Sequence, residues 1–303
     1  MELARAPGVR YLFGLETPVI GKDDAIRWQG IDGSAGVPLL TGPQRSLIIT
    51  GRVRYLGLDN RRNTLPPRLV AGSLGAFGSF AIGEVTLKSF VNFSLKSDGD
   101  TATWDAFSLI ASVGVEVPID DEWSATPSLF FSTAVRDTGG LSLRYIPLPD
   151  VTFAWKPSDS FELEFGLRSA KLRWDPAEWL TVEAGYTFPF GGSLRISERP
   201  AKWLRVIQFF GQYTDRYVLQ KERWGSNHLI RIEGFAGGIT HEFLLPLGNE
   251  PGAPVLAFGL TYAFAVGGKI RIWNYVDDDE LFELKARPAH NFGLSISLVF
   301  GSR

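Results

Sequence analysis

The sequence predicts an all-β fold, namely a transmembrane antiparallel up-and-down β-barrel of about 12–14 strands that forms a single domain over residues 1–303. Three observations support this prediction. Side-chain polarity alternates with a period of two along most of the chain, the alternating segments are long, and the joints between them are of a short and a long kind. The sequence contains no run of about 20 apolar residues, which a membrane-spanning helix would need.

The alternation is clearest over residues 85–96, where Val91 and Phe93 fall on one face and Asn92 and Ser94 on the other, with Phe90 as an exception. Successive side chains of a strand point to opposite faces, so this spacing predicts a strand with one apolar and one polar face. The same pattern recurs over residues 45–58, 141–145, 161–165, 180–186, 194–196, 230–232 and 269–272. A soluble β-sandwich would show it too, so alternation alone leaves both folds open.

Segment length favours the membrane barrel. The candidate strands at 102–118 and 227–245 exceed the ~5–6 residues usual in globular sheets and suit tilted strands that cross a bilayer. Several segments between residues 141 and 197 are too short to count as full-height strands, which sets the expected number at about 12–14.

The joints between the segments are asymmetric. Those at 118–121, 156–159, 175–178 and 189–192 are tight, whereas those at 59–67, 97–103, 217–227 and 274–281 are longer and polar. Short turns at one rim and longer loops at the other are typical of membrane barrels.

One internal repeat places aromatic residues around a turn. Residues 153–163 and 172–182 each read as strand, Trp, a Pro-containing turn, an aromatic residue and strand. We predict that these aromatic residues lie at the headgroup level of one rim, as aromatic girdles do. The alternative is a cross-strand aromatic pair that only stabilises the hairpin.

Composition and charge argue against several classes of function. The net charge of −2 gives no indication of nucleic acid as a partner, and the absence of Cys excludes a disulfide framework or a thiolate metal site. The glycines of residues 71–83 read as a bent strand and not as a phosphate loop, because no helix pattern follows them. We therefore expect no cofactor and no metal site.

The most specific motif is the last predicted strand, at about residues 288–300, which alternates apolar with small or polar side chains and ends on an aromatic residue. It closely resembles the C-terminal signal of bacterial outer-membrane barrels. The positions of that signal are filled here by Asn291, Gly293, Ile296, Leu298 and Phe300. The resemblance implies recognition by the barrel-assembly machinery during biogenesis and a location in the bacterial outer membrane. Residues 301–303 depart from the pattern, because the aromatic residue usually closes the chain.

The first residues carry neither the basic start nor the apolar segment of a signal peptide. Together with the barrel prediction, this leads us to expect that the numbering begins at a mature N-terminus.

Charged residues lie on the predicted polar faces, which a membrane barrel turns toward its lumen. The predicted lumen-lining residues are Arg52, Arg54, Lys88, Arg144, Glu162, Glu164, Lys171, Arg173, Glu183, Arg195, Arg231, Glu233, Lys269 and Arg271. Basic residues outnumber acidic ones in this set, and a basic excess inside a pore favours anions. A narrow barrel filled by Arg–Glu networks would instead be plugged.

The expected function is a porin-like channel for small solutes, with anions favoured if the basic excess lines the lumen. The alternative is a plugged structural barrel that anchors or binds other envelope components. Outer-membrane lipid and lipopolysaccharide are the expected surroundings in both cases. The acidic run at 277–280 reads as a solvated loop, and bridging of divalent cations or lipopolysaccharide is its alternative role.

The third hypothesis is a lipid-modifying enzyme. It is not the favoured one, because we expect that the chain is not an enzyme. Its three His residues are His228, His241 and His290, and Ser226 lies two positions from His228, so that both would share a strand face. None of these residues matches a catalytic signature, and no catalytic residue is predicted.

Overall fold

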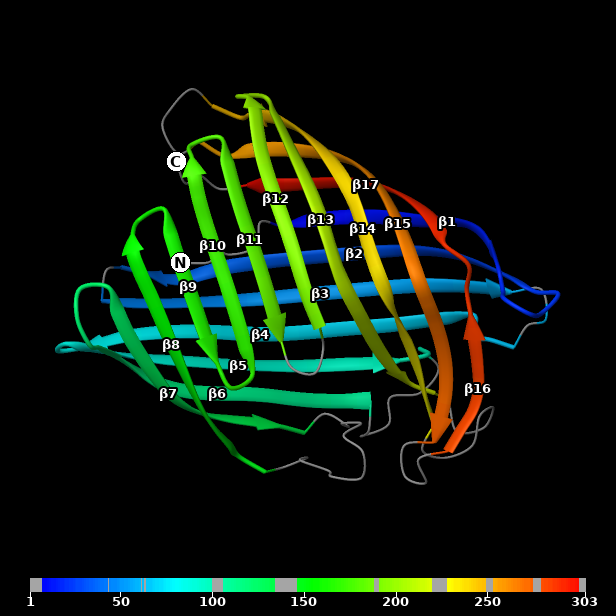
Figure 1. Ribbon diagram of the computed structural model, residues 1–303, viewed down its shortest axis with the longest axis horizontal. Helices are drawn as coiled ribbons and strands as arrows, with labels where there is room; N and C mark the ends of the chain where they lie inside the picture. The colour runs from blue at the N-terminus through cyan, green and yellow to red at the C-terminus, as the bar shows by residue number, and fades with distance from the viewer. Residues whose placement is uncertain are drawn as a thin grey trace.

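The computed structural model describes residues 7–42, 44–60, 62, 64–99, 106–133, 146–187, 191–219, 228–248, 253–274 and 279–299. Among these residues there is no helix with the length and apolar character to cross a membrane. The strands pair into one antiparallel sheet that closes on itself (Figure 1). The predicted fold class, an all-β antiparallel up-and-down barrel, is confirmed.

The strands follow one another around the ring in chain order. The first wall contains β1 (Gly8–Pro18), β2 (Ala25–Thr41), β3 (Arg45–Asn60), β4 (Arg68–Ile82), β5 (Val85–Ser97), β6 (Phe107–Pro118) and β7 (Trp123–Ser132). The second wall contains β8 (Leu148–Ser158), β9 (Phe161–Gly166), β10 (Ser169–Ala177), β11 (Leu180–Thr187), β12 (Gly191–Ala201), β13 (Leu204–Val218), β14 (His228–Pro246), β15 (Val255–Asn274) and β16 (Asp279–Lys285), and β17 (Ala289–Val299) runs beside β1 and joins the two walls.

The ring has sixteen positions, because β16 and β17 share one of them. Strand β15 pairs with β17 along residues 255–265 and with β16 along residues 269–274. Pairing of β1 with β17, from Gly8 opposite Ser297 to Gly14 opposite Asn291, closes the ring. The number exceeds the predicted 12–14 because the short strands β9 and β11, of 6 and 8 residues, each hold a full position.

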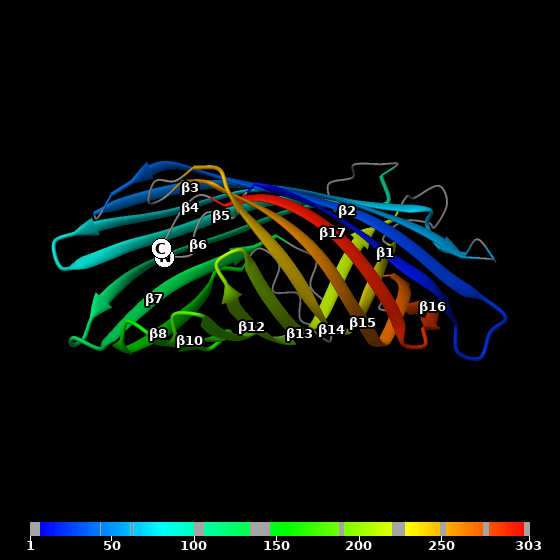
Figure 2. The same cartoon turned by 90° about the horizontal axis from the view of Figure 1, so that it is seen from above.

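The barrel is flattened, and its two walls cross. Figure 1 shows β1–β7 running across the view behind β9–β15, which run steeply, and Figure 2 shows the small depth of the molecule from above. Flattening brings opposite walls within reach of each other's side chains.

Antiparallel order puts the connections alternately at two rims. Residues 83–84, 119–122, 159–160, 178–179 and 202–203 join strands at what we call the turn rim. Residues 61–67, 98–106, 133–147 and 219–227 join strands at the opposite, loop rim. The predicted asymmetry holds for these joints but not around the whole ring. Residues 247–254 form a longer joint at the turn rim, and the short joints between β9 and β10 and between β11 and β12 lie at the loop rim.

The repeated hairpins lie side by side at the turn rim. In each, a Pro lies within a β-bulge, with register shifts after Trp155 and after Trp174. A third copy follows after Glu198, where Pro200 occupies the same place. Pro lacks an N–H, so an unpaired bulge position suits it. Stacking of Trp155 on Trp123, with ring centroids 5.8 Å apart, adds the aromatic neighbour expected of a girdle.

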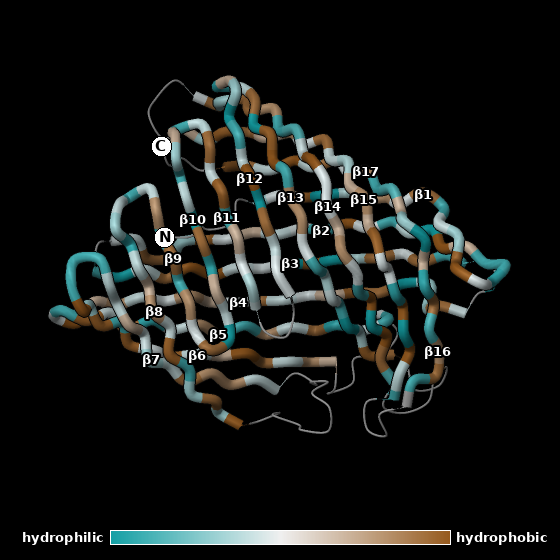
Figure 3. The backbone as a smooth tube through the Cα atoms, in the orientation of Figure 1, coloured by the Kyte–Doolittle hydropathy of each residue, from teal (hydrophilic) through white to brown (hydrophobic). Residues whose placement is uncertain are grey.

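The outer surface is apolar over most of the barrel, and Figure 3 shows hydropathy alternating along the strands. Val53, Leu74 and Leu294, on three different strands, are each more than half exposed, and other outward-facing positions are similar. A soluble protein of this size would not leave so many large apolar side chains uncovered, whereas a bilayer covers them.

The buried core lies inside the barrel, toward the loop rim. It is an apolar cluster contributed by both walls, consisting of Val19, Ile26, Leu58, Leu65, Leu69, Tyr217, Leu219, Ile230, Ile270, Ile272 and Leu284. Part of it comes from the β3–β4 connection, which turns inward: the Leu65 N–H donates to Asn60 Oδ1 (3.2 Å), and the Asn60 amide donates to Asp24 Oδ2 (2.9 Å). This cluster fills one side of the barrel mouth.

We predict that the cluster stabilises the barrel more than the lipid-facing surface does. Leu69→Ala removes a fully buried side chain and should lower the free energy of unfolding by about 2–5 kcal/mol. Leu74→Ala, on the outer face of the same strand, is the matched control and should cost less, about 1–2 kcal/mol, because lipid fills the space that the side chain leaves and no cavity forms. Urea unfolding of the barrel in lipid vesicles measures both, and equal losses would contradict this placement of the core.

Candidate functional site: a charged bridge across the lumen

A charged network crosses the inside of the barrel between strands that are not neighbours in the ring. Arg54 Nη1 on β3 lies 2.6 Å from Asp215 Oδ2 on β13, and Lys96 Nζ on β5 lies 3.0 Å from Asp215 Oδ1. Contacts between opposite walls pass through the interior, so these three side chains face the lumen. Directly paired residues of antiparallel strands share a face, and the register therefore assigns the remaining side chains to the lumen or the outside.

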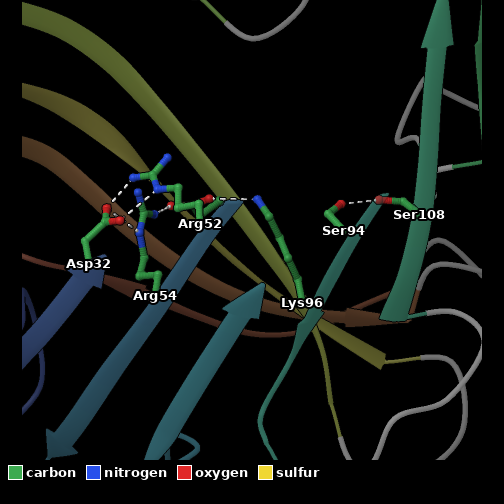
Figure 4. Close-up of polar contacts among 7 residues, drawn as sticks. Asp32, Arg52, Arg54, Ser94, Lys96 and Ser108 are labelled. Carbon is green, nitrogen blue, oxygen red and sulfur yellow. Dashed lines mark hydrogen bonds and ion pairs between the residues drawn. The ribbon is translucent and has the colours of Figure 1, made fainter. Parts of the chain in front are cut away.

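Asp32 on β2 extends the network. Arg52 donates to both oxygens of this carboxylate, with Nε 2.8 Å from Oδ1, and Arg54 Nε lies 3.3 Å from Oδ2. Figure 4 shows Asp32 facing the two arginines from β3, with Lys96 reaching in from β5. We call Asp32, Arg52, Arg54, Lys96 and Asp215 the lumen bridge. It contains three basic and two acidic side chains.

The backbone reinforces the bridge. Val218 at the end of β13 pairs with Ser97 at the end of β5, in the one parallel pairing among the described strands. The Asp98 N–H donates to the Val218 carbonyl oxygen at 3.2 Å. Opposite walls thus touch at the loop rim, and the barrel mouth is divided there. The apolar cluster fills the side that β13–β17 and β1–β4 enclose.

The side enclosed by β5–β12 is different, because its inward-facing ionic side chains are accessible to water. Lys171 is 63% exposed and Arg195 47%, although both face the lumen. Lys88 is 46% exposed and lies 2.8 Å from Glu116 on the next strand. Side chains inside a ring reach such exposure only where the interior is open to solvent.

The charges on this open side are largely paired between neighbouring strands. Lys171 lies 3.5 Å from Glu164, and Arg195 lies 3.5 Å from Glu183. Nearer the loop rim, Arg168 Nε lies 2.8 Å from the buried carboxylate of Asp150. Pairs this exposed contribute little stability, so their main effect is on the electrostatic field in the lumen.

The register places most of the sequence-predicted lumen residues on the inward face. These are Arg52, Arg54, Lys88, Glu162, Glu164, Lys171, Arg173, Glu183 and Arg195. Arg144 lies outside the described residues.

Four of the predicted residues, Arg231, Glu233, Lys269 and Arg271, lie on the outer face instead. Their sequence neighbours Ile230, Ile232, Ile270 and Ile272 belong to, or pack against, the apolar cluster inside the barrel. Alternation then directs the charged side chains outward. The prediction that they line the lumen is wrong, because the apolar face of these strands does not meet lipid along their full length.

The bridge also contains Asp32, Lys96 and Asp215, which are not among the predicted lumen-lining residues. Lys96 continues the polar face that begins at Lys88, so its periodicity was a usable signal. Asp32 and Asp215 carry no local signal, since the partners Arg54 and Asp215 are 161 positions apart in the chain. Only the closed ring brings them together.

The C-terminal motif lies on the strand that closes the barrel. Asn291 and Gly293 of β17 face inward with the β1 residues opposite them, and Ile296 and Leu298 face outward. Phe300 lies outside the described residues. Recognition by the assembly machinery stays a prediction.

The histidines lie on different faces of the wall. Alternation along β14 directs His228 inward, where it is buried, and His241 outward, and the neighbouring Glu242 faces inward toward Arg205. His290 faces outward, and a hydrogen bond of 2.8 Å joins its Nδ1 to the Tyr262 hydroxyl. Ser226 lies outside the described residues. In the described part of the chain, no group of His, Asp or Glu side chains is arranged to hold a metal ion.

A closed, even-numbered antiparallel ring with an apolar outer surface and a charged interior defines the class of transmembrane β-barrels found in bacterial outer membranes. No protein-family model matches the chain, and no curated protein does.

A comparison with solved structures finds outer-membrane barrels, among them three with TM-scores of 0.40 or less. An outer-membrane channel from Pseudomonas putida F1 shares 9% identity over 99% of this chain and 97% of its own, with a TM-score of 0.40. The translocator domain of the autotransporter NalP from Neisseria meningitidis shares 13% identity over 97% and 87%, with a TM-score of 0.34. OmpT, an outer-membrane protein of Vibrio cholerae, shares 11% over 96% and 98%, with a TM-score of 0.28. Function is therefore inferred from this chain's own geometry.

We predict that the two walls are energetically coupled through Asp215. Asp215→Asn should destabilise the barrel by about 1–3 kcal/mol, because it removes the carboxylate that pairs with both Lys96 and Arg54. Lys96→Met should cost less, about 1 kcal/mol, because Asp215 keeps Arg54 as a partner. In a double-mutant cycle, the second change should cost less once the first is made, with a coupling energy of about 0.5–3 kcal/mol. Unfolding in lipid vesicles measures it. A coupling energy of zero would mean that the lumen bridge does not hold the walls together.

Proposed function

We propose that this chain resides in the bacterial outer membrane and forms a narrow channel for small hydrophilic solutes. The passage runs through the part of the lumen that β5–β12 enclose, beside the lumen bridge. The apolar outer surface and the two unlike rims support the placement in the membrane, with the loop rim facing outward.

The observation that carries this proposal is the contrast between the two sides of the interior. On one side, cluster residues such as Leu69 and Ile272 are at most 1% exposed. On the other, the inward-facing side chains of Lys171, Arg173 and Arg195 are 63%, 53% and 47% exposed. A solute that crosses the barrel must follow the accessible side, where charged walls favour hydrated solutes over apolar ones.

The expected selectivity is a weak preference for anions. Most lumen charges on the open side are paired, which limits the field that they produce. The lumen bridge adds one net positive charge, since its three basic side chains face two carboxylates. Lys96 and Arg52 are 41% and 40% exposed, so both are within reach of a passing ion.

The second candidate function is a plugged barrel that anchors other envelope components. The apolar cluster and the direct contact of β13 with β5 favour it, because both close part of the mouth. The two candidates differ in conductance, since a plugged barrel passes no current.

Planar-bilayer recording tests the channel. We expect small steps of conductance and a reversal potential, in a salt gradient, that indicates a weak anion preference. The double variant Arg52→Gln, Lys96→Gln lowers the net charge of the bridge from +1 to −1 and should change the sign of the reversal potential. Each carboxylate keeps Arg54 as a partner, so the bridge is not lost.

Lys269→Gln is the matched control, because Lys269 lies on the outer face and its loss should leave selectivity unchanged. Absence of current at any voltage would favour the anchoring barrel. If the double variant has the same reversal potential as the wild type, ions do not pass the bridge.

A further inference from the structure

Six inward-facing side chains form one row across β3–β8, because each is directly paired with the next. We call this the lumen row, and it consists of Ile48, Phe77, Phe90, Ser112, Phe130 and Leu148. Strand β5 fixes its direction, since Lys96, on the same face as Phe90, reaches Asp215 across the interior. The row is apolar except for Ser112, and it contains three Phe rings.

The lumen row climbs the barrel wall. Ile48 is the fourth residue of β3 from the turn rim, whereas Leu148 is the first residue of β8 at the loop rim. Strand tilt has this effect, because a row of paired residues that crosses tilted strands rises along the barrel axis. On β4, Leu69 of the apolar cluster lies nearer the loop rim than Phe77, so the row passes below the cluster. From β5 onward the row lines the proposed passage.

Phe77 and Phe90 form what we call the aromatic platform. Their ring centroids lie 4.7 Å apart with an interplanar angle of 30°, so the two rings make a nearly continuous apolar surface. Phe77 is 43% exposed, although it faces the lumen and not lipid. A large apolar surface that is open to water gains free energy when a ligand covers it.

The third Phe of the row shows which kind of group such a ring accepts here. The guanidinium of Arg168, from the joint between β9 and β10, lies over the Phe130 ring, with its carbon 3.7 Å from the ring centroid. The edge of this planar group is bound as well, because Nε lies 2.8 Å from the Asp150 carboxylate. A flat group with hydrogen-bonding edges thus fits against the row, and the aromatic platform offers an exposed place for another.

The rows on either side of the platform supply uncharged hydrogen-bonding groups. Toward the loop rim, Thr50 Oγ1 and Asn92 Oδ1 converge over Gly75, where an added Cβ would lie 2.9 and 3.2 Å from them. Toward the turn rim, the hydroxyl groups of Ser46 and Ser79 are 2.7 Å apart. Each hydroxyl can both donate and accept, so these flanks complement a neutral ligand that is rich in hydroxyl groups.

The wall across the lumen is ionic. In a ring of sixteen positions β4 lies opposite β12, and Figure 1 shows β10–β12 in front of β3–β5. The inward-facing pairs Lys171–Glu164 and Arg195–Glu183, each 3.5 Å apart, belong to β9–β12. Such pairs offer donors and acceptors side by side, which hydroxyl groups can bind through charge-assisted hydrogen bonds. A solute in the passage therefore meets aromatic rings on one side and ionic groups on the other.

From this arrangement we infer that the lumen row is a binding track for a neutral oligosaccharide, with a sugar ring on the aromatic platform and its hydroxyl groups against the polar flanks and the ionic wall. A pyranose ring has an apolar C–H face and hydroxyl groups at its edge, which matches both sides. From Phe77 to Leu148 the row spans four strand spacings, about 19 Å, so more than one sugar unit fits. The inference rests on the proposed channel and names its class of solute.

Isothermal titration calorimetry of the detergent-purified barrel tests the track, with maltohexaose and cellohexaose as probes. At least one of these neutral, linear glucans should bind, with an affinity that salt changes little because the ligand carries no charge. Phe77→Leu with Phe90→Leu is the platform variant. It keeps the row apolar but removes the flat rings, and it should weaken binding about tenfold.

Two further variants separate stacking from a general effect on the barrel. Phe80→Leu with Phe93→Leu is the matched control, because both rings lie on the outer face of β4 and β5, and it should bind sugar as the wild type does. Asn92→Leu removes a polar flank and leaves the platform, and it should weaken binding several-fold. Equal affinity of the platform variant and the wild type, or an equal loss in the matched control, overturns the inference.

Charged probes and conductance distinguish the remaining outcomes. If benzoate or arginine binds and neither hexasaccharide does, the track serves charged planar solutes and the inference is wrong. In planar bilayers the bound sugar should interrupt the ion current, and the interruptions should be shorter in the platform variant. A barrel that binds sugar but passes no current loses the channel proposal and keeps the binding site, whereas a conducting barrel that binds neither hexasaccharide loses only this inference.

Discussion

The structure depends on the fact that hydrocarbon offers no hydrogen-bond partner to a polypeptide backbone. A sheet with free edges would expose unpaired N–H and C=O groups to the bilayer. Pairing of β17 with β1 removes these edges and so allows the whole sheet to span the membrane. Closure also decides what each side chain meets. With sixteen ring positions, the outward face can be almost wholly apolar while the inward face carries ionic groups that would be costly in lipid.

Flattening of the ring gives this barrel its particular interior. Because opposite walls approach each other, an apolar cluster and an ionic bridge form across a space that a rounder barrel would leave to water. The cluster and the bridge act on different parts of the lumen. Leu69, Tyr217 and their neighbours fill one side by packing, and Asp215 holds β13 against β3 and β5 through ion pairs. The remaining passage along β5–β12 is accordingly narrow and polar, which is why we propose small hydrophilic solutes.

Much of the fold could be predicted from the sequence, because the alternation of apolar and polar side chains is visible within each strand and does not depend on the other strands. Strand number was underestimated, since short strands such as β9 hold ring positions that length alone does not reveal. The candidate site was harder. Asp215 meets Arg54 only through closure, and the outward direction of Arg231 follows from a bend at residues 234 and 267 that reverses which face is buried. Alternation gives the two faces of a strand, but it does not say which one meets lipid.

Accessibility of single nitroxide labels along β14 tests most directly which face meets lipid, and the chain has no Cys to remove first. Cysteines placed at the outward positions 233, 235, 239 and 243 would be labelled in barrels reconstituted into vesicles. The labels at 235, 239 and 243 should collide with dissolved oxygen more than with a water-soluble nickel chelate, and the label at 233 should show the reverse. Preferential collision with the chelate at all four positions would contradict a membrane-facing wall, and preference for oxygen at all four would contradict the reversal of polarity near Glu233.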